Sequence, residues 1–250
     1  AARRIRYGAP QTHHSRPSPL NNYQTPASVS ELPESSRAAF VRRTYGHLAA
    51  AVAAFVVLEA ALITSGAGKA LASLMLGGRW SWLLVLGAFM LVSSLASNWA
   101  ASATRKSTQY LGLSLYVTAE AIIFAPLIMM ALRFDPNILT KATLITAGLF
   151  AGLSWIAYAT RRDFSFLGGF LRMAGMIALG TILASILFGF SLGTIFCVLM
   201  VALVGGSIIY QTSNVLHHYH TDQHVSAALA LFASFATLLW YVIQIVMDRD

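Results

Sequence analysis

The chain has 250 residues, of which 57% are hydrophobic and only 10% are charged. Soluble domains are about 45–50% apolar and about 25% charged, so this chain has too few polar groups to cover a globule in water. Its 17 Lys and Arg residues exceed its 9 Asp and Glu residues, which gives a formal net charge of +8. The basic residues stand at the ends of apolar segments and near the N-terminus. This pattern indicates membrane orientation and argues against a nucleic-acid partner.

Residues 1–40 differ in composition from the rest. They contain five prolines, with Ser, Asn and His between them, and no acidic residue precedes Glu31. No apolar core of a secretory signal is present, although the basic, acid-poor composition partly fits an organellar transit peptide. A disordered or partner-bound tail is the favoured interpretation. We therefore predict a tail over residues 1–40 and a single transmembrane domain over residues 41–250.

Seven apolar stretches follow, each near the ~20 residues that a bilayer requires. Because a backbone in lipid must satisfy its own hydrogen bonds and no barrel pattern is present, the stretches are predicted to be helices. The sequence thus predicts an all-α membrane bundle with spans at roughly 44–65, 82–102, 109–132, 139–160, 166–189, 192–212 and 225–246. The break at Gly189-Phe190-Ser191 is weak, and a miscount there would move the C-terminus to the other side of the membrane.

The distribution of basic residues predicts the orientation of the bundle. With the N-terminus inside, the outside set is Lys69, Arg79, Arg133, Lys141 and Arg249. The larger inside set, besides the arginines of the tail, is Arg37, Arg42, Arg43, Arg105, Lys106, Arg161, Arg162 and Arg172. We expect an N-terminus in the cytoplasm or its equivalent. A bacterial inner membrane is the first expectation, and the mitochondrial inner membrane is the second.

Three ionisable residues lie inside predicted spans, where charge is costly and suggests function. Glu59 is in the first span, Glu120 is deep in the third, and Arg172 is near the start of the fifth. An arginine so near the end of a span can extend to the headgroups, so a structural role is favoured for Arg172. The two glutamates either bind protons and line a cation path or are neutral and hydrogen-bonded to a neighbouring helix. The alternatives are balanced for Glu120, and the structural one is favoured for Glu59.

A histidine-rich stretch joins the last two spans. A transition-metal site or a pH sensor is one interpretation, and a solvated loop is the favoured one. The candidate side chains are His217, His218, His220, Asp222 and His224.

No catalytic motif accompanies these residues. The sequence has no phosphate-binding glycine loop, no HExxH and no Gly-x-Ser-x-Gly. The paired intramembrane aspartates of a membrane protease are also missing. We therefore expect a protein that is not an enzyme and that uses no cofactor.

Residues 155–171 contain the turn Arg161-Arg162-Asp163-Phe164-Ser165, followed by Gly168-Gly169. Asp163 and Ser165 are candidates to cap the next helix, and the glycines would permit close packing. This segment closely resembles the signature of the Bax inhibitor 1 family. The resemblance extends over about residues 40–246 and includes Ile209–Ser213 and Val225–Leu229. It implies a seven-helix fold with the last helix central.

The resemblance also implies functions. Family members are linked to pH-sensitive calcium leak and to cell-death control, and a bacterial member modulates a membrane-bound protease. In the leak model two aspartates of the last two spans form a proton-controlled latch. The equivalent positions here are Gln211 and, by counting, Ser234. Neither ionises, although the two side chains could still hydrogen-bond and hold the helices together.

Two functions therefore compete. The first is a pH-modulated leak for calcium or protons with an altered gate. The second is a binding or structural subunit that docks on a larger membrane complex, such as a membrane protease or a respiratory complex, through the N-terminal tail. Family resemblance favours the first function. The altered latch and the basic tail favour the second, towards which the sequence leans.

Overall fold

The structure is a computed structural model that describes residues 29, 33–102 and 105–249. This part of the chain forms eight helices, seven of which are long and apolar enough to cross a membrane. The predicted all-α bundle with seven spans is therefore confirmed. The helices are α1 (Glu34–Thr64), α2 (Ala67–Met75), α3 (Arg79–Ala100), α4 (Lys106–Phe134), α5 (Ile138–Thr160), α6 (Leu167–Phe188), α7 (Gly193–His217) and α8 (His224–Met247).

Two boundaries refine the prediction. α1 begins directly after Pro33, so residues 34–40 of the predicted tail are helical, while residues 1–28 and 30–32 lie outside the described part. The weak break is a genuine one, because α6 ends at Phe188 and Gly189 adopts a left-handed backbone with φ of 75°. Glycine takes this conformation without steric cost, which allows the chain to reverse in a short connection.

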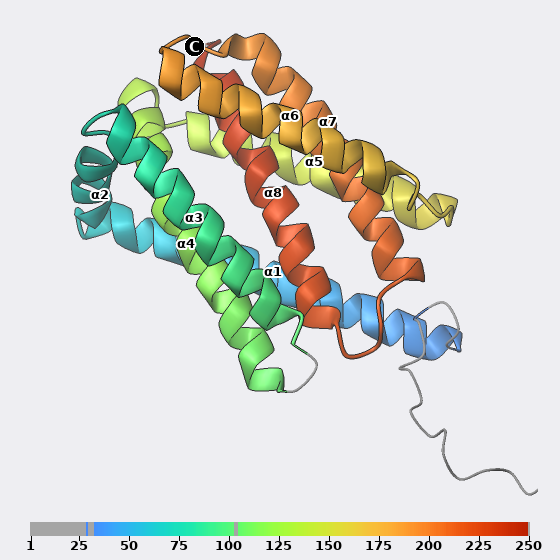
Figure 1. The fold of residues 1–250 in the computed structure, drawn as a ribbon. Helices are drawn as coiled ribbons and strands as arrows, with labels where there is room; N and C mark the ends of the chain where they lie inside the picture. Colours follow the sequence, from blue (N-terminus) through green and yellow to red (C-terminus); the bar gives the residue numbers. More distant parts are fainter. Residues whose placement is uncertain (1–28, 30–32, 103–104, 250) are drawn as a thin grey trace, which may run out of the picture.

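α8 runs through the middle of the bundle, with α3 and α4 to one side of it and α5 and α7 to the other (Figure 1). Most of α4 and α8 is buried, whereas few residues of α3 and α6 are fully buried. At the centre, Phe232 of α8 packs edge to face against Phe55 of α1 and Tyr116 of α4. The predicted central position of the last helix is confirmed.

The spans alternate in direction, so their connections gather at two ends of the bundle. We call one the turn end, because it carries the α5–α6 turn and the α7–α8 loop. There Tyr45 of α1 and Thr212 of α7 share a hydrogen bond of 3.3 Å. We call the other the C-terminal end, where the Arg79 guanidinium donates a hydrogen bond to the carbonyl oxygen of Leu187.

α3 and α4 approach each other closely at Gly112. A Cβ at this position would lie 2.5 Å from the carbonyl oxygen of Ala96 and 2.6 Å from the backbone nitrogen of Ala100. Ala96 and Ala100 are themselves fully buried. Small residues on both helices therefore permit backbone contact, which is how helices associate in lipid.

Candidate functional site

Glu120 lies near the middle of α4 and is only 5% exposed. Residues four apart share one face of a helix, and the hydroxyl of Tyr116 donates a hydrogen bond to the Glu120 carboxyl group. The structure thus gives the more deeply placed of the two predicted intramembrane glutamates a partner on its own helix. The sequence analysis considered a neutral Glu120 that is hydrogen-bonded to a neighbouring helix. The partner in the structure is instead on the same helix.

Glu120 lines a large cavity that we call the C-terminal cavity. It has a volume of about 710 Å³ and extends between α3, α4, α6, α7 and α8 towards the C-terminal end. Its two charged lining residues are both acidic, Glu120 in the interior and Asp248 just beyond α8. Polar groups line one side: Thr194 hydrogen-bonds to Asp248, and Cys197 donates to Gln244 at 3.7 Å. The cavity therefore favours a cation over an anion.

A second cavity, of about 330 Å³, lies between α3, α4, α7 and α8 in the half of the bundle nearer the turn end. We call it the serine cavity, because Ser93, Ser94, Ser97 and Ser226 line it. Tyr116 and Gln211 also line it. Tyr116 therefore contributes to the wall of the serine cavity while its hydroxyl contacts the carboxyl group that lines the C-terminal cavity.

Two polar atoms at the serine cavity have unmet hydrogen-bonding capacity. Gln211 Oε1 and Ser93 Oγ are buried and have no hydrogen-bond partner among the described residues. Buried polar atoms ordinarily have a partner, which in a polar cavity is often water. The unpartnered atoms thus favour a hydrated interior for this cavity.

The structure does not form the hydrogen-bonded latch that the sequence allowed. Ser234 is buried in α8, but Ala230 and Ala233, not Ser234, line the cavity with Gln211. Since Gln211 Oε1 accepts no hydrogen bond from the described residues, it accepts none from Ser234. Counting along the chain could not give the rotation of α8 relative to α7, which decides which residues of α8 lie beside Gln211.

The other two predicted intramembrane charges lie elsewhere. Glu59 is 6% exposed in α1, and its Oε1 has no hydrogen-bond partner in the described part of the chain. Glu59 lines neither cavity. Arg172 is exposed on the outward-facing helix α6, which agrees with a structural position at the headgroups.

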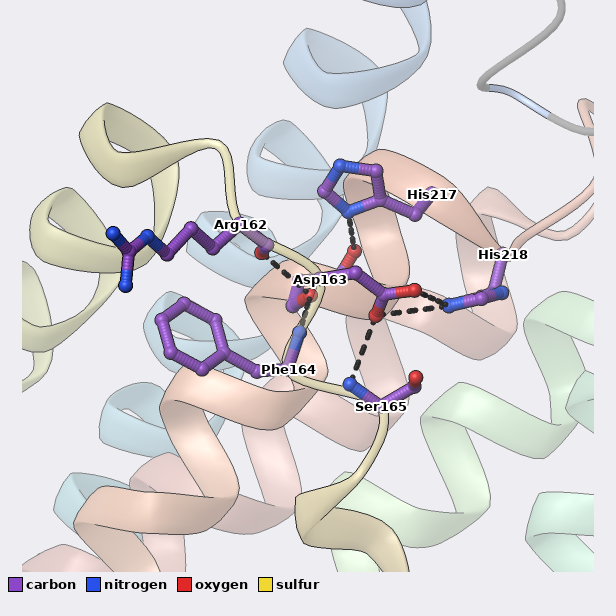
Figure 2. A network of polar contacts seen from close by, with 7 residues as sticks. Arg162, Asp163, Phe164, Ser165, His217 and His218 are labelled. Atoms are coloured by element: carbon purple, nitrogen blue, oxygen red, sulfur yellow. Dashed lines mark hydrogen bonds and ion pairs between the residues drawn. The ribbon is translucent and has the colours of Figure 1, made fainter.

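The α5–α6 turn is stabilised by Asp163, but not by capping the next helix (Figure 2). Asp163 Oδ1 accepts a hydrogen bond from the backbone N–H of Ser165 at 2.8 Å. Neither Asp163 nor Ser165 caps α6, whose N-cap position is Phe166, so the capping prediction was wrong. The carboxylate closes a local turn before the helix starts. Arg161, with φ of 51°, ends α5, and the side chains of Arg161 and Arg162 are exposed at this end.

The predicted glycine packing is confirmed at one position of two. A Cβ at Gly168 would lie 3.0 Å from the hydroxyl oxygen of Tyr210, whereas Gly169 has open space around it. Gly168 therefore lets the start of α6 lie against α7 immediately beside Gln211.

Ser213 joins the turn to α7. Its hydroxyl accepts a hydrogen bond from the Phe164 backbone N–H at 2.9 Å and donates to the Arg162 carbonyl oxygen at 3.3 Å. The His218 ring pairs with the Asp163 carboxylate at 3.1 Å (Figure 2). The Ser165 backbone N–H, and secondly His218, lower the pKa of Asp163 below the usual range. The turn is thus attached to the C-terminal part of α7 through Ser213 and to the residue that follows this helix, His218.

The histidine-rich stretch is divided among several environments. His217 contacts the carbonyl oxygen of Ser213, and the His220 backbone N–H donates to Gln223. Asp222 is exposed, while His224 is buried in α8 with its ring centre 5.0 Å from that of His47. Within the described residues, no three His, Cys, Asp or Glu side chains come together to hold a metal ion. The geometry gives the metal interpretation no site in this part of the chain.

Sequence reasoning missed Tyr116 and Ser213. Tyr116 carried a usable signal, because it precedes Glu120 by one helical turn. Ser213 belongs to a stretch that the family resemblance includes, but its bond to Phe164 spans 49 residues, and helical periodicity cannot reveal such a contact.

Comparisons with known proteins show what the chain is similar to. The family model described as "Inhibitor of apoptosis-promoting Bax1" matches residues 37–250. Bax inhibitor 1 of Schizosaccharomyces pombe is 26% identical over 235 residues, which cover 90% of this chain and 82% of that protein. Bax inhibitor 1 of Oryza sativa subsp. japonica is 31% identical over 138 residues, covering 52% of this chain and 54% of the relative. An uncharacterized protein of Pseudomonas aeruginosa is 30% identical over 161 residues, covering 63% and 68%.

Proposed function

This chain is a multi-pass membrane protein that belongs to the Bax inhibitor family, and from that premise we propose that it conducts cations through the bundle by way of Glu120. One observation carries the proposal: a carboxyl group that is 5% exposed lines the C-terminal cavity and is hydrogen-bonded to a side chain of the serine cavity. A costly ionisable group at such a place is the usual mark of an ion path in a membrane protein.

The two cavities support a path with separate access from each end. The C-terminal cavity extends to Asp248 at one end of the bundle, and the serine cavity includes Gln211 and Ser226 near the other. Glu120 lines the C-terminal cavity and Tyr116 lines the serine cavity. Among the described residues, we identify no other side-chain hydrogen bond that joins the two cavity walls. A gate at this contact takes the place of the two-aspartate latch, whose positions here carry Gln211 and Ser234.

The test is ion flux into liposomes that contain the purified full-length protein. One set of vesicles encloses a calcium-sensitive dye, and a second set encloses a pH-sensitive dye. Glu120→Gln keeps the shape of the side chain but removes its charge and its ability to exchange a proton. We expect this variant to lower the flux of the conducted ion by about tenfold or more, in line with the loss of a positioned titratable group.

Glu59→Gln is the matched control, because Glu59 is equally buried but lines neither cavity. Its flux should equal that of the parent. If Glu120→Gln conducts both ions at the parent's rate while remaining folded, the proposed path is wrong. The pair Gln211→Asp and Ser234→Asp extends the test: pH-gated flux that appears only in this double variant would support a lost latch.

A second candidate function is that of a subunit that docks on a larger membrane complex. Val29 favours this role, since it is fully buried and its N–H donates to the Tyr219 carbonyl oxygen at 2.9 Å. The contact attaches a residue shortly before α1 to the α7–α8 loop at the turn end. The basic residues at this end support its location in the cytoplasm or its equivalent.

Purification in mild detergent tests the docking role, and residues 1–28 are the segment to delete because Val29 and α1 then stay intact. We expect a membrane protease or a respiratory subunit to co-purify with the full chain and to be lost with the deletion. If the full-length protein migrates alone on a native gel, the docking role fails. Neither function requires catalysis or a cofactor.

A further inference from the structure

Tyr116 stands between the two cavities, and its position has a consequence for the kind of ion that can pass. Its side chain is 8% exposed and lines the serine cavity, while its hydroxyl group donates a hydrogen bond to Glu120 in the C-terminal cavity. A solvated metal ion would have to pass this contact bodily. A proton needs only a continuous chain of hydrogen bonds.

The surroundings of Glu120 do not suit calcium. Ca²⁺ takes about six to eight oxygen ligands in proteins, at about 2.3–2.6 Å. The carboxyl group of Glu120 has Phe89, Ile123 and Phe124 as fellow lining residues, and its hydrogen-bond partner is a single phenol. The titratable groups that line the same cavity are Cys197 on α7 and Tyr241 and Asp248 on or beside α8. In the described residues no cluster of acidic, histidine or cysteine side chains completes a metal site.

The serine cavity supplies what a proton path requires on the other side. It holds several hydroxyl groups and the Gln211 amide, and two of its buried polar atoms lack a partner among the described residues. A cavity of about 330 Å³ with these polar groups in its wall has room for several waters, each of which occupies about 30 Å³ in the liquid. Water there can accept a proton from the Tyr116 hydroxyl and pass it towards the turn end.

From this geometry we infer that the conducted cation is the proton, and that the Tyr116 hydroxyl relays it between Glu120 and water in the serine cavity. A proton from water in the C-terminal cavity binds a carboxylate oxygen of Glu120. Protonation reverses the hydrogen bond, so that the carboxyl O–H donates to the Tyr116 oxygen and the Tyr116 O–H turns to a water of the serine cavity. The carboxyl O–H bond then breaks as a new O–H bond forms at the Tyr116 oxygen, and the original Tyr116 proton moves to that water. Glu120 is left as a carboxylate, and one proton has crossed with no oxidation or reduction.

This inference rests on the proposed cation path and is tested separately from it. Vesicles enclosing a pH-sensitive dye receive a potassium diffusion potential, and proton entry is followed in the parent, Tyr116→Phe and Glu120→Gln. Tyr116→Phe removes one oxygen atom only. We expect it to slow proton entry about 100-fold, the lower limit of what a positioned proton-transfer group contributes. Proton entry in the parent should also be slower in D₂O.

Tyr110→Phe is the matched control. It makes the same change on the same helix at a residue that lines neither cavity. Proton entry in Tyr110→Phe should match that in the parent, and calcium entry in the parent should match that in empty vesicles.

The outcomes of the two site variants separate the relay from the path. If Glu120→Gln stops proton entry but Tyr116→Phe does not, the path stands and the relay is wrong. Calcium entry at a rate similar to that of protons overturns the selectivity. If neither variant changes any flux, the path itself fails. Equal unfolding temperatures of the variants establish that they are folded.

Discussion

His218 at the end of α7 lies 3.1 Å from the carboxylate of Asp163, a residue that precedes it by 55 positions. With the Ser213 bonds to the same turn, this pair attaches the α5–α6 connection to the helix that carries Gln211. The α5–α6 turn therefore also contacts a helix that it does not connect, α7. It holds the last turns of α7 beside the serine cavity.

Stability at acid pH should depend on Asp163. Hydrogen bonds from the Ser165 backbone and from His218 lower the pKa of this carboxyl group in the folded state. Its stabilising effect is complete above the unfolded pKa of about 3.9 and is lost as the pH falls through the lower folded value. Thermal unfolding in detergent between pH 3 and pH 6 should show a loss at the acid end that is smaller in Asp163→Asn. Asp222→Asn, in the exposed loop, should follow the parent. An acid loss of equal size in Asp163→Asn would contradict the assignment.

Ser213→Ala should destabilise the bundle. The substitution leaves the Phe164 N–H and the Arg162 carbonyl oxygen without their partner at a position where Ser213 is fully buried. An unsatisfied buried polar group costs about 1–3 kcal/mol. Ser207→Ala is the control, since its hydroxyl bonds only to the Leu203 carbonyl oxygen within α7. Denaturant unfolding in mixed micelles measures both variants, and equal midpoints for the two would show that the bridge to the turn contributes nothing.

Gly112→Ala should separate α3 from α4. The added methyl group would meet the backbone of α3 at 2.5 Å, and backbone atoms cannot move aside as a flexible side chain can. Overpacking of this kind costs about 1–3 kcal/mol. Gly148→Ala adds the same methyl group to α5 with nothing within 4 Å and should be neutral or slightly stabilising. The unfolding temperatures of the two variants give the comparison; a Gly112→Ala protein as stable as Gly148→Ala would mean that the helices are not in backbone contact.

Glu59→Met and Glu120→Met should differ in sign. Glu59 Oε1 is buried with no hydrogen-bond partner among the described residues, so replacing the carboxyl group with an apolar one of similar size should be neutral or stabilising. In Glu120→Met the buried hydroxyl of Tyr116 loses the carboxyl group that it contacts, which should cost about 1–3 kcal/mol. Unfolding in detergent at pH 7 decides the order. A large loss in Glu59→Met would reveal a role for Glu59 that its surroundings do not show.

The fold follows from the sequence more completely than the site does. The spacing and length of apolar stretches predict the seven spans, because the bilayer imposes both. The short helix α2 escaped prediction, since its 9 residues are too few to stand out between two spans. The start of α1 at Glu34 also escaped it, because the first turns of this helix contain Ser and Arg and lack an apolar run.

For the candidate site, the sequence could identify Glu120 from the cost of burying a carboxyl group in lipid. It could not place Tyr116 and Gln211 on one cavity, because that depends on how α4 and α7 rotate about their axes. The same limit explains Ser234: counting finds the helix, while the packing of α8 decides which of its residues face Gln211. The Asp163 capping prediction failed because the carboxylate bonds to Ser165 before the helix begins.

The central position of α8 also bears on how the protein is made. α8 fills the middle of the bundle, yet it is synthesised after α1 to α7. Until it enters the membrane, Phe55 and Tyr116 lack the ring of Phe232 against which they pack. The packing of α1 and α4 at the centre of the bundle is therefore complete only once α8 is in place.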